Sequence, residues 1–123
     1  MVERNSIARR KAEARGRWAE RYAALYLRST GHAILDQRAR TPLGEVDLIV
    51  CKRDVLGFVE VKQRQSEASA LQAVSDHSWQ RISRAAAYWA ARHPHYKELN
   101  WRYDLVAVTP WRLPKHYRDF WRP

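Results

Sequence analysis

Two short apolar runs, each with a carboxylate inside it, constrain the fold of this sequence more than any other feature. The runs are Val46–Val50 and Gly57–Val61, both rich in β-branched residues, and the polar residues 52–54 join them. Runs of this length on either side of a turn predict a β-hairpin. An ionised carboxylate is costly to bury unless it is paired or binds a metal, so Asp47 and Glu60 need a partner.

A tight hairpin would bring these carboxylates together. Side chains at positions i and i+2 share one face of a strand, so Glu45 and Asp47 point one way, as do Glu60 and Lys62. The turn places Asp47 and Glu60 at neighbouring positions on adjacent strands. Two carboxylates with the carbonyl oxygen of Val61 form a hard oxygen site suited to Mg²⁺ or Mn²⁺. Lys62 would then stand beside a bound phosphate.

An acidic residue followed by a strand with a Glu-x-Lys motif resembles the PD-(D/E)xK superfamily of restriction-endonuclease-like nucleases. The chain as a whole is similar to the YraN family of small bacterial nuclease-related proteins. The segments with this similarity span nearly all of the chain. They are Gly16, Ala19-Glu20, Ala23, Tyr26-Leu27, Gly31, Arg38–Arg40, Gly44–Ile49, Phe58–Lys62, Arg64 and Trp101–Val108.

The resemblance implies an α/β fold with a restriction-endonuclease-like αβββαβ core, in which helices flank a mixed sheet. It also implies that the metal ligands Asp47, Glu60 and Val61 work with Lys62 and with Glu20, a glutamate on the first helix. Glu45 would serve a second metal or the outer shell of the site. Read from the helix alone, Glu20 is more simply a surface partner of Arg17 or Arg21.

Hydrophobic spacing predicts the remaining elements in an order that matches this core. We expect a helix at 11–29, a strand at 32–37, the acidic hairpin, a loop at 63–73, a helix from Ser75 to His93, and a strand at 101–108. The tail at 110–123 is aromatic and basic. It either packs as a short edge strand or presents a stacking surface, and packing is the preferred interpretation.

Composition limits the domain count and the compartment. With 123 residues, of which 46% are hydrophobic, the chain can build one core. We therefore expect a single domain at 11–123, after a basic mobile arm at 1–10. The only cysteine, Cys51, excludes an internal disulfide and a cysteine-ligated zinc site. No segment resembles an export signal or a membrane span, so we expect a cytoplasmic protein.

The charge balance predicts a polyanionic partner. A net charge of +10 favours nucleic acid, although a generally basic surface accounts for the charge equally well. Each candidate phosphate-binding residue has the same alternative of a solvated surface charge. These candidates are Arg9, Arg10, Lys11, Arg38, Arg40, Arg64, Arg81 and Arg84. We expect no membrane partner and no small-molecule cofactor, because the sequence has no amphipathic basic helix or nucleotide fingerprint.

The pattern and the resemblance together predict a Mg²⁺- or Mn²⁺-dependent endonuclease that hydrolyses phosphodiester bonds of nucleic acid, with DNA as the first candidate; the resemblance also implies branched DNA. The metal would activate water for in-line attack, and Lys62 would orient that water or stabilise charge developing on phosphorus. One alternative is a non-catalytic nucleic-acid-binding protein on a nuclease scaffold, and another is a basic interaction protein of ribosomal or repair assemblies. The sequence leaves open the form of the nucleic acid, the number of metals and the oligomeric state, a homodimer included.

Overall fold

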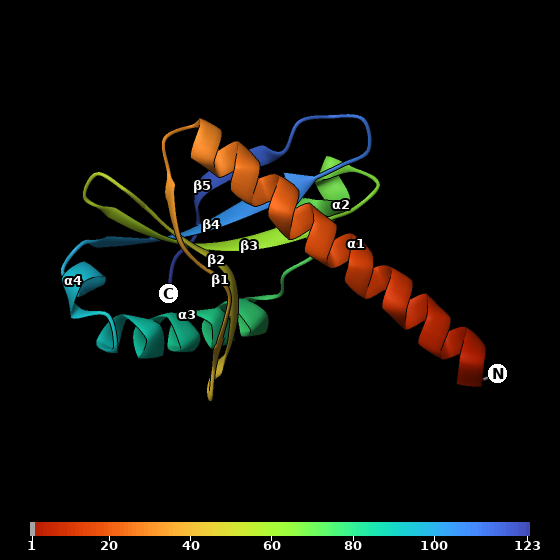
Figure 1. Cartoon of the computed structure of the whole chain (residues 1–123). Helices are drawn as coiled ribbons and strands as arrows, with labels where there is room; N and C mark the ends of the chain where they lie inside the picture. The colour runs from red at the N-terminus through yellow and green to blue at the C-terminus, as the bar shows by residue number, and fades with distance from the viewer. Residues whose placement is uncertain (1) are drawn as a thin grey trace.

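One five-stranded sheet forms the centre of the molecule (Figure 1). A computed structural model describes residues 2–123, with side chains from residue 5 onward. The strands lie in sequence order: β1 Ala33–Thr41, β2 Gly44–Lys52, β3 Val55–Gln63, β4 Asn100–Val108 and β5 Lys115–Trp121. Only β3 and β4 pair in parallel, so the sheet is mixed. The predicted α/β class and mixed sheet are confirmed.

The acidic hairpin forms as the sequence predicts. Strands β2 and β3 pair antiparallel, with Leu48 opposite Val59 and Lys52 opposite Val55. Two residues, Arg53 and Asp54, make the turn, and Arg53 has a left-handed backbone with φ of 56°. A two-residue turn with positive φ matches the twist of the flanking strands, so it fixes the register of the pair.

Helices cover both faces of the sheet. They are α1 Val2–Ser29, α2 Glu67–Leu71, α3 Asp76–Ala91 and α4 Pro94–Lys97. Helix α1 packs on one face around Leu27, Leu48 and Val59, and α3 packs on the other around Phe58 and Trp79. The segment from α2 to α4 makes the crossover that a parallel β3–β4 pair requires. No helix of the described chain is long and apolar enough to cross a membrane.

The first helix is longer than the spacing of apolar residues indicates. It begins at Val2, and Figure 1 shows its N-terminal part projecting beyond the sheet. Residues 2–10 of the expected mobile arm are therefore helical, and Met1 lies outside the described residues. This part of the chain contains no Gly or Pro to stop a helix, and it has no apolar stripe that would have revealed one.

Two further segments differ from the prediction. Within the expected loop at 63–73, the five residues of α2 are helical, because the Ser66 hydroxyl caps the helix by accepting a hydrogen bond from the Ser69 N–H. Strand β1 continues past residue 37 to Thr41, so Arg38 and Arg40 lie in a strand and not in a loop. The predicted end of this strand at residue 37 is wrong.

The N-cap of α3 and the packing of the tail agree with the prediction. The Ser75 hydroxyl accepts a hydrogen bond from the Ser78 N–H at 3.1 Å. The tail forms the edge strand β5, and the rings of Trp121 and Trp79 stack with centroids 5.8 Å apart. Residues 109–114, between β4 and β5, form a loop in which Trp111 and Leu113 are exposed.

Candidate active site

Asp47 lies where the regular pairing of the hairpin ends. The first residue of β2 that pairs with β3 is Leu48. Asp47, which precedes it, contacts β3 through its side chain. Asp47 Oδ2 accepts a hydrogen bond from the backbone N–H of Val61 at 2.8 Å. This bond fixes the carboxylate of Asp47 beside the backbone of Glu60 and Val61, as the hairpin pattern predicts.

Asp47 and Glu60 form a largely buried acidic pair. The Glu60 side chain is 13% exposed. Burial, then the charge of Asp47 and a hydrogen bond to its carboxylate, raise the pKa of Glu60 well above 4.5. Burial also raises the pKa of Asp47, against the opposing effect of hydrogen bonds from Val61 and Glu60. The raised pKa values mean that the protein compensates the negative charge of this pair poorly when both acids are ionised.

Lys62 is the cation nearest to this pair among the described ion pairs. Its Nζ lies 3.7 Å from Glu60 Oε2, and its side chain is 28% exposed. The two residues sit two positions apart on β3, which is a central strand. Glu60 and Lys62 are therefore not an exposed ion pair on an edge strand. Lys62 borders the buried acids and still reaches solvent.

Glu20 approaches the same site from α1, but an arginine of β1 binds it. Arg38 Nε donates a hydrogen bond to Glu20 Oε2 at 2.8 Å, and the Glu20 side chain is 15% exposed. Burial raises the pKa of Glu20, the Arg38 hydrogen bond opposes this, and the charge of Asp47 adds to it. Glu20 is therefore close enough to sense Asp47, and its partner is Arg38 instead of a neighbour on its own helix.

Glu45 lies at the rim of the site. It forms an ion pair with Arg40 at 3.7 Å, and both side chains are more than half exposed. The structure thus brings Asp47, Glu60 and Lys62 together. Glu20 lies beside them and is paired with Arg38, and Glu45 is exposed to solvent.

Three cavities open onto these residues. One of about 350 Å³ lies between α1 and the end of β3 and is lined by Asp47 and Lys62. A second, of about 550 Å³, lies on the side of Arg38 and reaches Asp47 and Glu60. A third, of about 180 Å³, joins Glu60 to α3. A ligand can therefore approach the acidic pair from more than one side.

The donor set fits a cation that keeps much of its water. Within residues 2–123, no three Asp, Glu, His or Cys side chains are grouped closely enough to hold a metal by themselves. Arginines engage Glu20 and Glu45, which leaves the Asp47 and Glu60 carboxylates as protein ligands. Mg²⁺ is commonly bound by one or two carboxylates, with waters and phosphate oxygens completing its octahedron. The pair matches that pattern, whereas a centre with three carboxylates is not formed.

The predicted basic residues divide into two groups. Arg38, Arg40, Arg64 and Arg81 line the three cavities, whereas Arg9, Arg10, Lys11 and Arg84 are exposed outside them. Arg15 of α1 also lines the 350 Å³ cavity, and the prediction missed it. Its position four residues before the buried Ala19 places it on the inward side of the helix, a signal that helical spacing contained.

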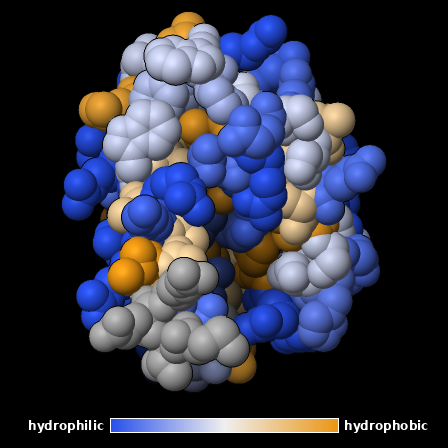
Figure 2. Space-filling model, turned by 90° about the vertical axis from the view of Figure 1, so that its right-hand side faces the viewer, coloured by the Kyte–Doolittle hydropathy of each residue, from blue (hydrophilic) through white to orange (hydrophobic). Residues whose placement is uncertain are grey.

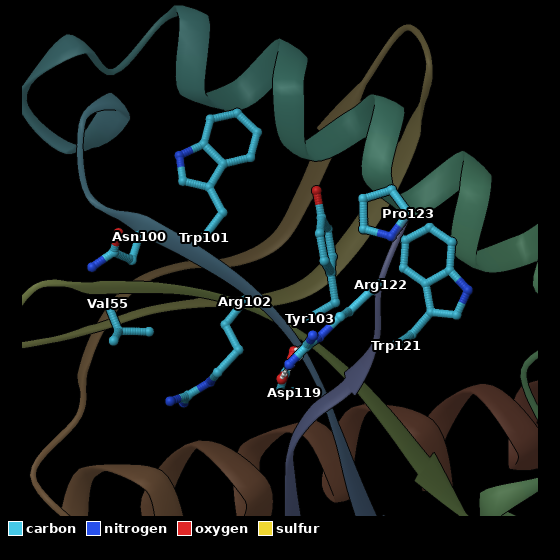
Figure 3. Close-up of a pocket in the computed structure, with 9 residues that line it drawn as sticks. All are labelled: Val55, Asn100, Trp101, Arg102, Tyr103, Asp119, Trp121, Arg122 and Pro123. Atoms are coloured by element: carbon cyan, nitrogen blue, oxygen red, sulfur yellow. Dashed lines mark hydrogen bonds and ion pairs between the residues drawn. The ribbon is translucent and has the colours of Figure 1, made fainter.

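A different cavity, of about 510 Å³, opens at the opposite end of β3 and β4 (Figure 3). Trp101 and Tyr103 point from β4 toward α3, and Arg102 points the other way. The carboxylate that lines this cavity, Asp119, is bound by Arg122. The paired carboxylates and the lysine are therefore separate from this aromatic cavity.

The fold defines the class of this protein before any comparison. Its five-stranded mixed sheet between α1 and α3, with acidic residues on the central hairpin, is compatible with the restriction-endonuclease-like fold. Residues 19–108 match the model of the uncharacterised protein family UPF0102, which is the YraN family, and the chain belongs to this family.

Full-length relatives agree with the family match. The chain is 50% identical to a UPF0102 protein of Agrobacterium fabrum over 96% of this chain and 97% of the relative. It is 47% identical to one of Maricaulis maris over 94% and 91% of the two chains. A third, from Rhizobium johnstonii, is 49% identical over 90% and 91%. The family resemblance drawn from the sequence is confirmed.

Proposed function

We propose that this protein is a metal-dependent nuclease that hydrolyses phosphodiester bonds of nucleic acid, with DNA as the first substrate to test. The main support is the buried pair Asp47 and Glu60, whose pKa values are raised, with Lys62 3.7 Å from Glu60. Perturbed carboxylates that line an open cavity are typical of catalytic sites. The net charge of +10 supports a polyanionic substrate.

Each residue of the site has a distinct role in this proposal. Mg²⁺ or Mn²⁺, held by Asp47, Glu60 and the Val61 carbonyl, would supply Lewis-acid chemistry at the phosphate and lower the pKa of water. The Val61 N–H orients the Asp47 carboxylate, and both acids must lose their protons before they can bind a cation. The Lys62 ammonium places positive charge where negative charge develops on phosphorus.

Basic side chains around the cavities would hold the phosphates on either side of the scissile bond. Arg15 and Arg64 line the cavity that contains Lys62, and Arg81 lines the cavity on the α3 side of Glu60. Arginine binds phosphate oxygens in a bidentate manner, which fixes orientation as well as adding affinity. Figure 2 shows hydrophilic residues interspersed with pale and hydrophobic ones at the end of the molecule from which α1 projects.

The test of this function compares cleavage with binding. Wild type, Glu60→Gln and Lys62→Met are incubated with labelled duplex, single-stranded and flapped DNA in Mn²⁺. We expect Glu60→Gln to abolish cleavage and Lys62→Met to slow it about a hundredfold, in line with the loss of one preorganised electrostatic group. DNA affinity should change little, because Met keeps most of the lysine stem.

Arg84→Met provides the matched control, because it removes a positive charge that lies outside the three cavities. It should cut at nearly the wild-type rate. If Lys62→Met and Arg84→Met cut equally fast, or if the rate of every variant follows its affinity alone, the proposed role of Lys62 is wrong.

One observation favours a second candidate, a nucleic-acid-binding protein that keeps the scaffold without catalysis. Arg38 and Arg40 engage Glu20 and Glu45, so only two carboxylates remain for a metal. Under this alternative, wild type and Glu60→Gln bind all three DNAs equally well and neither cuts in Mg²⁺ or Mn²⁺.

A further inference from the structure

A cavity of about 700 Å³ lies next to the candidate active site, where β3 and β4 end. Its lining residues include Trp18 and Tyr22 of α1, Gln63 of β3, and Trp111, Arg112 and Leu113 of the β4–β5 loop. We refer to it as the aromatic cleft. The Tyr22 hydroxyl donates a long hydrogen bond, 3.4 Å, to the backbone carbonyl of Arg112. This contact ties the loop to α1.

Both tryptophans of the cleft are unusually exposed. Trp111 is fully exposed, and Trp18 is 58% exposed. The backbone of Trp111 is left-handed, with φ of 63°, which is uncommon for a bulky side chain. Unusual backbone conformations and exposed apolar patches both concentrate at binding sites. The β4–β5 loop therefore keeps the Trp111 indole in solvent.

The cleft has the surface that an unpaired base requires. The rings of Trp18 and Tyr22 are stacked, with centroids 5.2 Å apart and planes 28° apart, and they form an aromatic surface along α1. Arg112 adds a positive charge at the same cavity. Aromatic rings beside cations are the features that bind single-stranded nucleic acid, since every base has a face that stacks. Bases inside a duplex are already stacked and do not offer that face.

The cleft is continuous with the candidate active site. Gln63 lines both the aromatic cleft and the cavity that contains Asp47 and Lys62. A nucleotide strand with a phosphate at Lys62 would therefore have its neighbouring bases beside Trp18 and Trp111.

We propose that the aromatic cleft binds an unpaired base of single-stranded nucleic acid, through stacking on Trp18 and Trp111. As far as it names a substrate, this inference rests on the proposed nuclease function: the strand to be cut is single-stranded or carries a single-stranded tail.

Binding in EDTA tests the cleft separately from catalysis. The probes are a labelled single strand of about 12 nucleotides, within the site size of single-strand binders, an abasic strand with the same phosphates, and a duplex of equal length. Wild type should bind the strand with bases roughly tenfold more tightly than the abasic strand, as one or two stacked bases provide. Trp111→Leu should remove this preference, Trp111→Phe should keep it, and duplex affinity should stay constant in all three proteins.

Three results would overturn the inference. Wild type binds the two strands equally; Trp111→Phe loses the preference as fully as Trp111→Leu; or Leu113→Ala loses it while Trp111→Leu keeps it. The last result would place the base against Leu113 instead of the Trp111 indole. Because Trp111 is fully exposed, neither of its variants removes packing that the fold needs.

The outcome also separates the cleft from the nuclease proposal. If wild type cuts DNA but shows no preference for bases, the cleft proposal fails and the nuclease proposal stands. If the preference depends on Trp111 but no DNA is cut, the cleft binds single strands and the nuclease proposal fails.

Discussion

Asp47 and Glu60 weaken the fold that contains them. Both carboxylates are largely buried, and the protein supplies one backbone N–H to Asp47 and one ammonium, at 3.7 Å, to Glu60. The negative charges of Asp47 and Glu60 repel each other, and burial strengthens the repulsion because little solvent screens it. Such a pair lowers the stability of the folded protein, and binding of a proton or a cation relieves the repulsion.

The first prediction is a pH dependence of stability that these two residues cause. Their pKa values are 3.8 and 4.5 without perturbation and higher in the folded protein, so the folded state binds protons more tightly than the unfolded chain. Stability without metal should therefore fall as the pH rises from about 4 through the raised pKa values. Asp47→Asn/Glu60→Gln should melt above wild type in EDTA, by a margin that grows with pH over this range.

Cation binding should reverse that order. A metal at 100 times its Kd that binds only the folded state adds about 2.7 kcal/mol to stability, and this gain requires the two carboxylates. Mg²⁺ or Mn²⁺ should raise the melting temperature of wild type and leave that of Asp47→Asn/Glu60→Gln unchanged. A margin that does not vary with pH, or an equal metal effect on both proteins, would show that the acidic pair is not a cation site.

At the scale of single residues, local pattern predicts the centre of the site and misses its surroundings. The alternation of apolar and polar residues in the hairpin places Asp47, Glu60 and Lys62 correctly, because strand period and turn length determine their positions. The pair of Glu20 with Arg38 joins α1 to β1. No local rule connects these elements, and Arg38 also has an uncommon φ of 51°.

At the scale of elements, local sequence predicts α3 and β4, whereas β5 depends on contacts with other parts of the chain. An N-cap and a helical stripe predict α3. Alternation of polar and apolar residues predicts the position of β4, but the half-buried strand that it implies is wrong, because Tyr103–Val108 is buried throughout. Strand β5 has no clear alternation of buried and exposed residues. It is held by its pairing with β4 and by contacts to one buried acid, Asp104. The sequence predicts either Arg102 or a cross-strand arginine as the partner of Asp104, and the structure has Arg102. The second partner, His116, depends on the β4–β5 register.

The second prediction concerns Asp104, which joins β4 to β5. It is fully buried and accepts hydrogen bonds from Arg102, from His116 at 2.8 Å, and from the Asp119 N–H at 3.0 Å. Burial alone would raise the pKa of Asp104, but these bonds outweigh it and the pKa is lowered. Its contribution is therefore present above pH 3.8 and lost as the pH falls through the lowered pKa.

Asp104→Asn should destabilise the protein by about 3 kcal/mol at neutral pH, because it removes the buried charge of Asp104 and leaves Arg102, whose side chain is only 19% exposed, without a counter-charge. Urea unfolding followed by circular dichroism measures this loss. Asp119→Asn is the matched control: its carboxylate pairs with Arg122 in solvent, and only its backbone contacts Asp104. The control should unfold close to wild type. Equal losses in the two variants would mean that the Asp104 network does not hold β5 in place.

At the scale of the whole molecule, the net charge of +10 and the projecting part of α1 point to one mode of binding. The exposed Arg9, Arg10 and Lys11 lie on consecutive positions of α1, N-terminal to the residues that line the carboxylate cavities. Three successive residues of a helix point in different directions, so they cannot read one row of bases. They can attract phosphates from several sides, which raises affinity without selecting a sequence.

The third prediction is the salt dependence of that affinity. If about four to six phosphates are neutralised, the logarithm of the binding constant for duplex DNA should fall with the logarithm of salt concentration with a slope of about −4 to −5. Arg9→Gln/Arg10→Gln/Lys11→Gln keeps residues that favour a helix and should make the slope shallower by roughly 2. Glu13→Gln, on the same helix, is the control, and it should not make the slope shallower. Fluorescence anisotropy over a salt series measures each slope, and a slope that the triple variant leaves unchanged would show that this part of α1 does not contact the phosphates.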